Sequence, residues 1–291
     1  MPVVAALLPA YNEEHHVASV LVRLRPLVDV MIVCDDGSVD LTGDIAEAMG
    51  AVVIRHERNL GYGAAVRSLF KEALGRGVDV AVTIDADDQH DPGELTRLVD
   101  ALGDGYDVVI GSRFLEGNGS QVPGWRRKGI EVINAITANG HPVTDSQSGF
   151  RAYSRRALES LSLTESGMGV STEILLKAGE AGLRIGEVPT SVRYHADSST
   201  HNPVLHGVGV LLSTVKLLSI RHPLLFFGVP GFAFTLFAVV MWVWTLQNYS
   251  VTRFFSTNLA VISMAATFVG FILMTTAMII WVMVSVVREG D

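Results

Sequence analysis

Residues 80–92 of the chain read V-A-V-T-I-D-A-D-D-Q-H-D-P, an apolar run that ends in a group of carboxylates. The run at 80–84 is too short for a helix, and its valine and isoleucine content is typical of a buried strand. Open α/β sheets bind ligands at the carboxyl ends of their strands, so the carboxylates at positions 85, 87, 88 and 91 mark a candidate site. A solvated acidic turn before a helix that starts at Asp91-Pro92 is the alternative.

The oxygen-bearing side chains of this segment suit one class of ligand. Asp85, Asp87 and Gln89 alternate by two and offer only oxygen atoms. Such ligands suit hard divalent cations, which proteins often hold together with substrate phosphates. The segment therefore predicts a Mg²⁺ or Mn²⁺ site at the end of a strand.

The first two-thirds of the chain repeats the order strand, polar turn, helix. Strand patterns occupy residues 3–8, 28–34, 51–55, 80–84, 107–111 and 185–192, and a further strand-like segment follows the polar turn at 145–151. Helical patterns run from 14 to 24, up to 49, up to 74 and from 172 to 181. This alternation predicts an α/β fold with a Rossmann-like, mostly parallel sheet. The glycine-rich turn at 61–63 lacks the spacing of the dinucleotide-binding and P-loop fingerprints, so neither applies.

Composition bounds the class of protein. The chain has 291 residues and a formal net charge of −8, an acidic balance that argues against non-specific nucleic-acid binding. An anionic substrate must therefore meet locally placed cations. The single cysteine, Cys34, excludes an internal disulfide and fits a reducing compartment. The mean hydropathy of +0.36 is high for a soluble protein, and the excess lies in the last third.

The apolar tail predicts two membrane spans. Residues 224–246 and 259–287 carry no charge, and each stretch is long enough to cross a bilayer. A buried helical hairpin of a soluble protein is the alternative. Residues 201–222 are expected to form an amphipathic helix in the membrane interface, or else a helix packed on the domain's own core. We therefore expect a domain at 1–200, this interface helix, and a transmembrane hairpin within 223–291.

The basic residues around the two spans predict their orientation. Lys216, Arg221 and Arg288 flank the outer ends of the pair, whereas only Arg253 lies in the connecting loop. Because cytoplasmic loops carry an excess of lysine and arginine, the N-terminal domain and the C-terminus are expected in the cytoplasm.

Four motifs occur in a fixed order: PAYNEE at 9–14, DDGSVD at 35–40, DADDQH at 85–90 and DSQSGFR at 145–151. Together they resemble glycosyltransferase family 2, and more closely its dolichyl-phosphate mannose synthase group with the related polyprenyl-phosphate hexosyltransferases. The resemblance covers about two-thirds of the chain, and the ordered set is specific. It implies a GT-A fold, a nucleotide-sugar donor and a divalent cation.

The same resemblance implies a role for individual residues. Asp87 and Gln89 would hold the metal, which stabilises a departing diphosphate as a Lewis acid. Arg113 and Arg127 match the arginines that bind an acceptor phosphate, and Asp85, Asp87 and Arg113 form the expected catalytic set. The expected donor-binding residues are Pro9, Tyr11, Glu13, Cys34, Asp36, Asp85 and Ala86.

The expected activity is transfer of a hexose, from UDP-glucose or GDP-mannose, to dolichyl or polyprenyl phosphate at the cytoplasmic face of the cell membrane. Inversion at the anomeric centre is implied by the family. Residues 194–203 differ from the basic stretch of the mannose synthases, so the donor stays open. A transferase for another lipid or lipid-linked acceptor is one alternative. A non-catalytic membrane scaffold is another, although the intact Asp85, Asp87 and Gln89 argue against it.

Overall fold

The computed structural model describes residues 2–115, 143–192, 219 and 223–289. The chain divides into two compact units, Met1–Ser213 and Thr214–Asp291. The predicted interface helix at 201–222 falls outside the described residues except for position 219, and so does Arg127.

The described part of the first unit is built on one seven-stranded sheet, in the spatial order β3-β2-β1-β4-β6-β5-β7. The strands are β1 (Val4–Ala10), β2 (Val30–Asp35), β3 (Val52–Arg55), β4 (Val80–Thr83), β5 (Val108–Ser112), β6 (Arg151–Ser154) and β7 (Ile185–Pro189). All neighbours pair in parallel except β6, which runs antiparallel to both β4 and β5. The predicted mostly parallel sheet is confirmed, and β6 corresponds to the strand-like segment expected after the 145–151 turn, although the sequence did not indicate its reversed direction.

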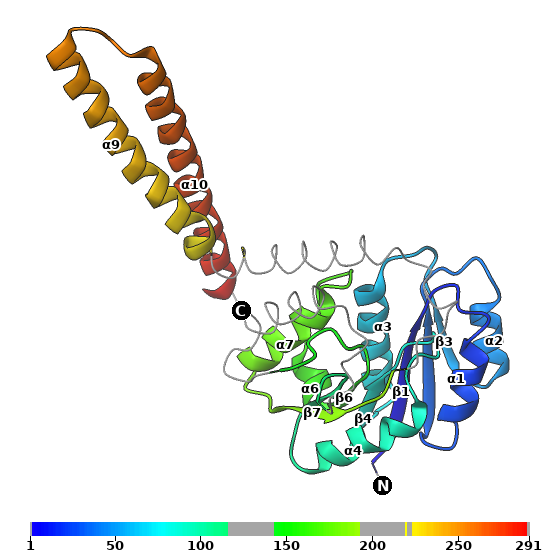
Figure 1. The fold of residues 1–291 in the computed structure, drawn as a ribbon. Helices are drawn as coiled ribbons and strands as arrows, with labels where there is room; N and C mark the ends of the chain where they lie inside the picture. The colour runs from blue at the N-terminus through cyan, green and yellow to red at the C-terminus, as the bar shows by residue number, and fades with distance from the viewer. Residues whose placement is uncertain (1, 116–142, 193–218, 220–222, 290–291) are drawn as a thin grey trace. The chain divides into compact units, whose positions relative to one another are not determined.

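Helices cover both faces of this sheet (Figure 1). One face carries α1 (Val17–Leu24), α2 (Thr42–Ala48) and α4 (Leu95–Gly103), and the other carries α3 (Tyr62–Gly75), α6 (Arg155–Ser160) and α7 (Val170–Glu180). Successive side chains of a strand point to opposite faces, so Leu7 packs beneath α3 whereas Leu8 packs beneath α1. Both are fully buried, and each such burial contributes about 2 kcal/mol.

Local capping explains where the elements differ from the sequence prediction. The short helix α6 was not predicted; the Ser154 hydroxyl caps it by accepting from the backbone N–H of Ala157 at 3.2 Å. The predicted strand at 185–192 ends early, at Pro189, because the N–H of Ser191 turns away to the carboxylate of Glu94. A 3₁₀ turn, η1 (Pro92–Glu94), begins directly after the acidic segment.

The second unit contains two long apolar helices. A π-helical turn at Leu224–Gly228 leads into α9 (Val229–Thr252), and α10 (Thr257–Glu289) follows. The stretches Leu224–Thr252 and Thr257–Val284 are long and apolar enough to cross a membrane. Only 17% and 11% of their most apolar windows are buried, which differs from the core helix of a soluble protein.

Small and hydroxyl-bearing residues join the two apolar helices. A Cβ atom added at Gly270 would lie 2.6 Å from Oγ1 of Thr235, so α9 and α10 approach closely there. The indole N–H of Trp242 donates to Thr267 at 3.2 Å, and the hydroxyls of Thr245 and Ser263 lie 3.4 Å apart. These contacts hold the predicted hairpin together, while most large apolar side chains stay on its outer surface.

A buried cation shapes the turn that precedes β6. Arg151 is 1% exposed, and its guanidinium donates to three backbone carbonyls. Nε bonds to Ser148 at 2.8 Å, Nη1 to Ser171 at 3.1 Å and Nη2 to Ser146 at 2.6 Å. None of the ion pairs found in the described residues involves Arg151. The side chain therefore acts as an internal cross-link between the 146–148 turn and the start of α7.

Replacing Arg151 with methionine is expected to destabilise the domain. The change removes three hydrogen bonds from a buried charge to backbone carbonyls, which should lower the free energy of unfolding by roughly 3–5 kcal/mol. The thermal midpoint in detergent should fall by about 10 °C. Arg155→Met is the matched control, because that half-exposed arginine ion-pairs with Glu159 at the surface. A midpoint equal to that of the control would contradict the cross-linking role.

Candidate functional site

Strand register gathers the motifs at one edge of the sheet. Ala10 of β1 pairs with Asp35 of β2, and Leu7 of β1 pairs with Thr83 of β4. Because the three strands are parallel, the loops that follow them leave the sheet at the same edge. The PAYNEE, DDGSVD and DADDQH motifs thus meet there, as the sequence predicts.

Three carboxylates crowd this edge. Burial, followed by the charge of Asp87, raises the pKa of Asp85 to about 7, while a hydrogen bond from Tyr62 and the charge of Arg113 oppose the shift. Burial and then Asp87 likewise raise the pKa of Glu13. The cluster therefore holds more negative charge than its surroundings offset, and a divalent cation would relieve it.

The donor atoms of the acidic segment fit such a cation. The Asp87 carboxylate accepts from the backbone N–H of Gln89 at 3.1 Å, so one turn carries both predicted ligands. Among the described residues, no group of three His, Cys, Asp or Glu side chains is arranged to hold a metal by itself. Mg²⁺ sites commonly combine one or two carboxylates with water and substrate phosphates, so two protein ligands are compatible with the prediction.

The loop after β1 is tied to the loop after β2. Asn12 has a left-handed backbone, with φ of 57°, which asparagine tolerates better than most residues. Its N–H donates to the Ser38 hydroxyl at 3.0 Å, and its side-chain oxygen accepts from the N–H of Val39 at 3.0 Å. The N–H of Glu13 donates to Thr42 at 2.8 Å. Sequence reasoning gave no role to Asn12, although an asparagine directly after a strand is a turn signal.

The Asp36 carboxylate forms hydrogen bonds with other residues of the domain. One carboxylate oxygen lies 2.6 Å from Nδ1 of His56 and accepts from the N–H of Leu60 at 3.0 Å. The other accepts from the N–H of Gly61 at 2.8 Å. Because Asp36 is only 3% exposed, its carboxylate anchors the glycine-rich turn, and a contact with the donor stays a prediction.

Three other predicted donor residues are also buried. Pro9, Cys34 and Ala86 all lie in the interior, so their side chains present little surface to a ligand. Burial, followed by the charges of Asp36 and Asp35, raises the pKa of the Cys34 thiol to about 12. The thiol is therefore neutral near pH 7, and it lies 3.6 Å from Nε2 of His56. Tyr11, by contrast, is half-buried.

Arg113 is held rigidly by a buried carboxylate. Its Nε and Nη2 donate to the two oxygens of Asp145 at 2.6 and 2.8 Å, and its backbone N–H donates to the same side chain at 3.1 Å. Asp145 is fully buried and receives this bidentate pair from the DSQSGFR turn. The sequence placed Asp145 in a motif but did not pair it with Arg113.

His90 packs, as a neutral side chain, against the DSQSGFR turn. Its ring packs against Phe150 with centroids 5.1 Å apart. Burial, followed by the charge of Arg113, lowers its pKa to about 4. The imidazole is therefore neutral at physiological pH, and it adds no positive charge to the site.

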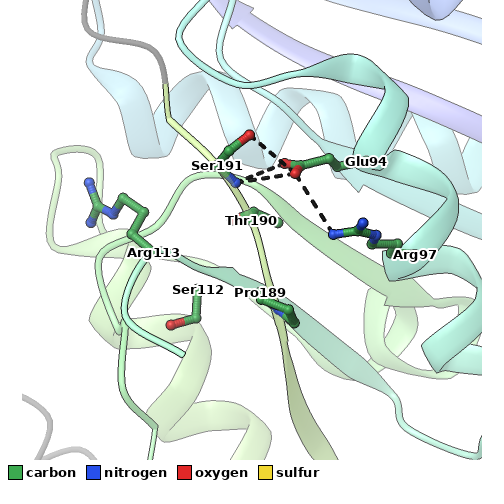
Figure 2. A pocket seen from close by; sticks show the side chains of 7 residues that line it. All are labelled: Glu94, Arg97, Ser112, Arg113, Pro189, Thr190 and Ser191. Atoms are coloured by element: carbon green, nitrogen blue, oxygen red, sulfur yellow. Dashed lines mark hydrogen bonds and ion pairs between the residues drawn. The ribbon is translucent and has the colours of Figure 1, made fainter. Parts of the chain in front are cut away.

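A small polar hollow of about 40 Å³ lies beside Arg113. Figure 2 shows Arg113 on one side of the hollow and Glu94 with Arg97 on the other. Glu94 accepts from the N–H of Ser191 at 3.0 Å and from its hydroxyl at 3.2 Å. The hollow has room for about two or three water molecules.

Residues 6–162 match the sequence model of the family described as "Glycosyl transferase family 2". The chain belongs to glycosyltransferase family 2. Over 98% of its length the chain is 29% identical to glycosyltransferase AglJ of Haloferax volcanii, of which it covers 95%. Over 73% of its length it is 36% identical to the dolichyl-phosphate hexose transferase of the same organism, of which it covers 92%.

Solved structures support the predicted fold. The chain is similar to glucosyl-3-phosphoglycerate synthase from Mycobacterium tuberculosis in complex with Mn²⁺, uridine diphosphate and glucosyl-3-phosphoglycerate. The TM-score is 0.57 at 26% identity, over 74% of this chain and 79% of that one. This family 2 glycosyltransferase therefore has the predicted GT-A catalytic fold.

Gly149 provides a test of how the Asp85 carboxylate is placed. A Cβ added at Gly149 would lie 2.6 and 2.9 Å from the two Asp85 oxygens. Gly149→Ala is expected to displace the carboxylate and lower the rate of glycosyl transfer about tenfold or more, with little change in thermal midpoint. Gly75→Ala is the control, since nothing lies within 4 Å of its added Cβ. Equal rates for the two variants would show that the position of Asp85 does not matter.

Proposed function

We propose that this protein transfers a hexose from a nucleotide sugar to dolichyl or another polyprenyl phosphate. The observation that carries the proposal is the 36% identity to a dolichyl-phosphate hexose transferase, 92% of which the chain covers. The acidic edge at Asp85 and Asp87, and the fixed arginine at 113, supply the two kinds of charge that this reaction requires.

The donor half of the site lies at the acidic edge. Asp87 and Gln89 would hold Mg²⁺ or Mn²⁺, and the bound cation supplies Lewis-acid stabilisation of the departing diphosphate. The solved relative binds Mn²⁺ together with uridine diphosphate, which supports the use of a divalent cation. Asp85 would lie against the donor sugar or ribose, next to the metal. UDP-glucose and GDP-mannose remain the two candidate donors.

The acceptor half requires cations rather than a strong base. A phosphate monoester is already anionic near neutral pH, so its oxygen attacks without prior removal of a proton by the protein. Arg113 is directed by Asp145 and would pair with the acceptor phosphate, together with Arg127. Attack from the face opposite the leaving diphosphate would invert the anomeric centre and give a β-linked lipid phosphate sugar.

The apolar helices suit a lipid acceptor. Leu224–Thr252 and Thr257–Val284 would span the cell membrane, with the catalytic domain and the C-terminus in the cytoplasm. This arrangement would confine the enzyme to the surface where a polyprenyl phosphate presents its head group.

The test is transfer of label from radioactive UDP-glucose and GDP-mannose, in parallel, to dolichyl phosphate. Purified full-length protein in detergent with Mn²⁺ should label the lipid phase from one donor. Chelation with EDTA should abolish transfer, and added Mn²⁺ or Mg²⁺ should restore it.

Asp87→Ala should lower transfer by at least about 100-fold because it removes a cation ligand. Donor hydrolysis without lipid labelling would point to another acceptor, and no donor binding at all would favour a non-catalytic scaffold.

Alanine at Arg113 or Arg127 is expected to separate acceptor use from donor use. Each variant should lose transfer by about 100-fold, because a charged hydrogen-bonding partner of the phosphate is gone. Mn²⁺-dependent binding of the donor, measured by calorimetry, should survive and also reports that the protein is folded. Arg76→Ala, which removes an arginine that pairs with Glu72 on the surface of α3, is the control and should retain activity. Active Arg113 and Arg127 variants would refute the lipid-phosphate assignment.

A further inference from the structure

The Gly61-Tyr62-Gly63 turn is clamped between two parts of the domain. Gly61 has φ of 100°, and its N–H donates to the Asp36 carboxylate at 2.8 Å. The N–H of Gly63 donates to the carbonyl of Ser166 at 2.9 Å. A Cβ on Gly61 would collide with the Ser166 carbonyl oxygen, and one on Gly63 with that of Glu165. The first residue of α3, Tyr62, is therefore held in place by its neighbours on both sides.

The Tyr62 side chain reaches from this turn to the end of β4. Its hydroxyl donates to Oδ1 of Asp85 at 3.2 Å. Gly149 lies beside both groups, because its added Cβ would fall 2.6 Å from Oδ2 of Asp85 and 2.8 Å from the Tyr62 hydroxyl. The Gly149 carbonyl is in turn fixed by the Thr83 hydroxyl at 2.7 Å. Asp85 is thus enclosed by Tyr62 and Gly149.

We propose that Tyr62 is a positioning residue for glycosyl transfer, whose hydroxyl holds the Asp85 carboxylate in the orientation that receives the nucleotide-sugar donor. The inference rests on the proposed function, in which Asp85 faces the donor beside the metal. Tyr62 comes from α3 and Asp85 from the end of β4, so the hydrogen bond connects the glycine-rich turn directly to the donor site.

A packing role for the tyrosine ring predicts a different outcome. The ring packs against the core cluster on the α3 side of the sheet, and a phenylalanine would preserve that packing. Tyr62→Phe removes only the hydroxyl, so a residue that merely packs would tolerate it. A residue that acts through Asp85 would lose transfer while the stability of the fold is kept.

The experiment uses full-length protein in detergent with Mn²⁺, dolichyl phosphate and the donor that supports transfer. Tyr62→Phe is expected to lower kcat/KM for the donor about tenfold, because one hydrogen bond to a charged group is lost. KM for dolichyl phosphate and the thermal midpoint should stay unchanged. Tyr106→Phe is the matched control; its ring lies under Arg184 at the other side of the domain core. Wild-type kinetics in Tyr62→Phe would overturn the inference and leave the proposed function intact.

A double-mutant cycle tests whether Tyr62 acts through Asp85. Mn²⁺-dependent affinity for UDP-glucose and for GDP-mannose is measured by calorimetry in Tyr62→Phe, Asp85→Asn and the double variant. If the hydroxyl works only by orienting the carboxylate, the double variant binds no more weakly than Asp85→Asn alone. Additive losses would overturn the inference. If the wild-type protein transfers nothing to dolichyl phosphate, the proposed function fails, and this cycle still decides the role of Tyr62. An absence of donor binding in the wild type would overturn both.

Discussion

The buried guanidinium of Arg151, which pairs with no carboxylate of the described residues, is the constraint on which the 145–149 turn depends. Burying a charge is costly unless it is fully hydrogen-bonded, and Arg151 meets this condition by donating to three carbonyls at 2.6–3.1 Å. Those bonds set the conformation of residues 145–149. At one end of this turn Asp145 directs Arg113, and at the other end Gly149 abuts Asp85. One interior cation therefore supports a turn that contacts both Arg113 and Asp85.

The carboxylates at the acidic edge carry negative charges that suit the binding of a divalent cation. Burial raises the pKa values of Asp85 and Glu13, and the charge of Asp87 raises both further. Such crowding costs stability in the free protein and favours a bound divalent cation. The hydrogen bond from the Tyr62 hydroxyl and the positive charge of Arg113 both oppose the rise in the pKa of Asp85. Rigid placement before the substrate arrives lowers the reorganisation that transfer requires.

The apolar unit follows a separate physical rule. Its two helices satisfy their backbone groups internally, as a bilayer demands, and the few polar contacts between them join hydroxyl and indole groups. Large apolar side chains such as Phe232, Phe268 and Trp281 stay exposed, so the hairpin presents a surface that lipid covers better than water does. In the proposed reaction, a lipid-borne acceptor and a membrane-held enzyme would share one surface, which would raise their effective concentration.

The sequence alone determined the α/β class, the acidic strand end and the two apolar helices, because residue periodicity and run length are local properties of the chain. It missed the reversal of β6, since the direction of a strand depends on the path of the chain before it. It also missed the bonds from Asp145 to Arg113 and from Tyr62 to Asp85. These partners lie 32 and 23 residues apart, and only strand register and helix packing bring them together. The sequence thus indicated which residues carry charge, and the tertiary structure decided which of them pair.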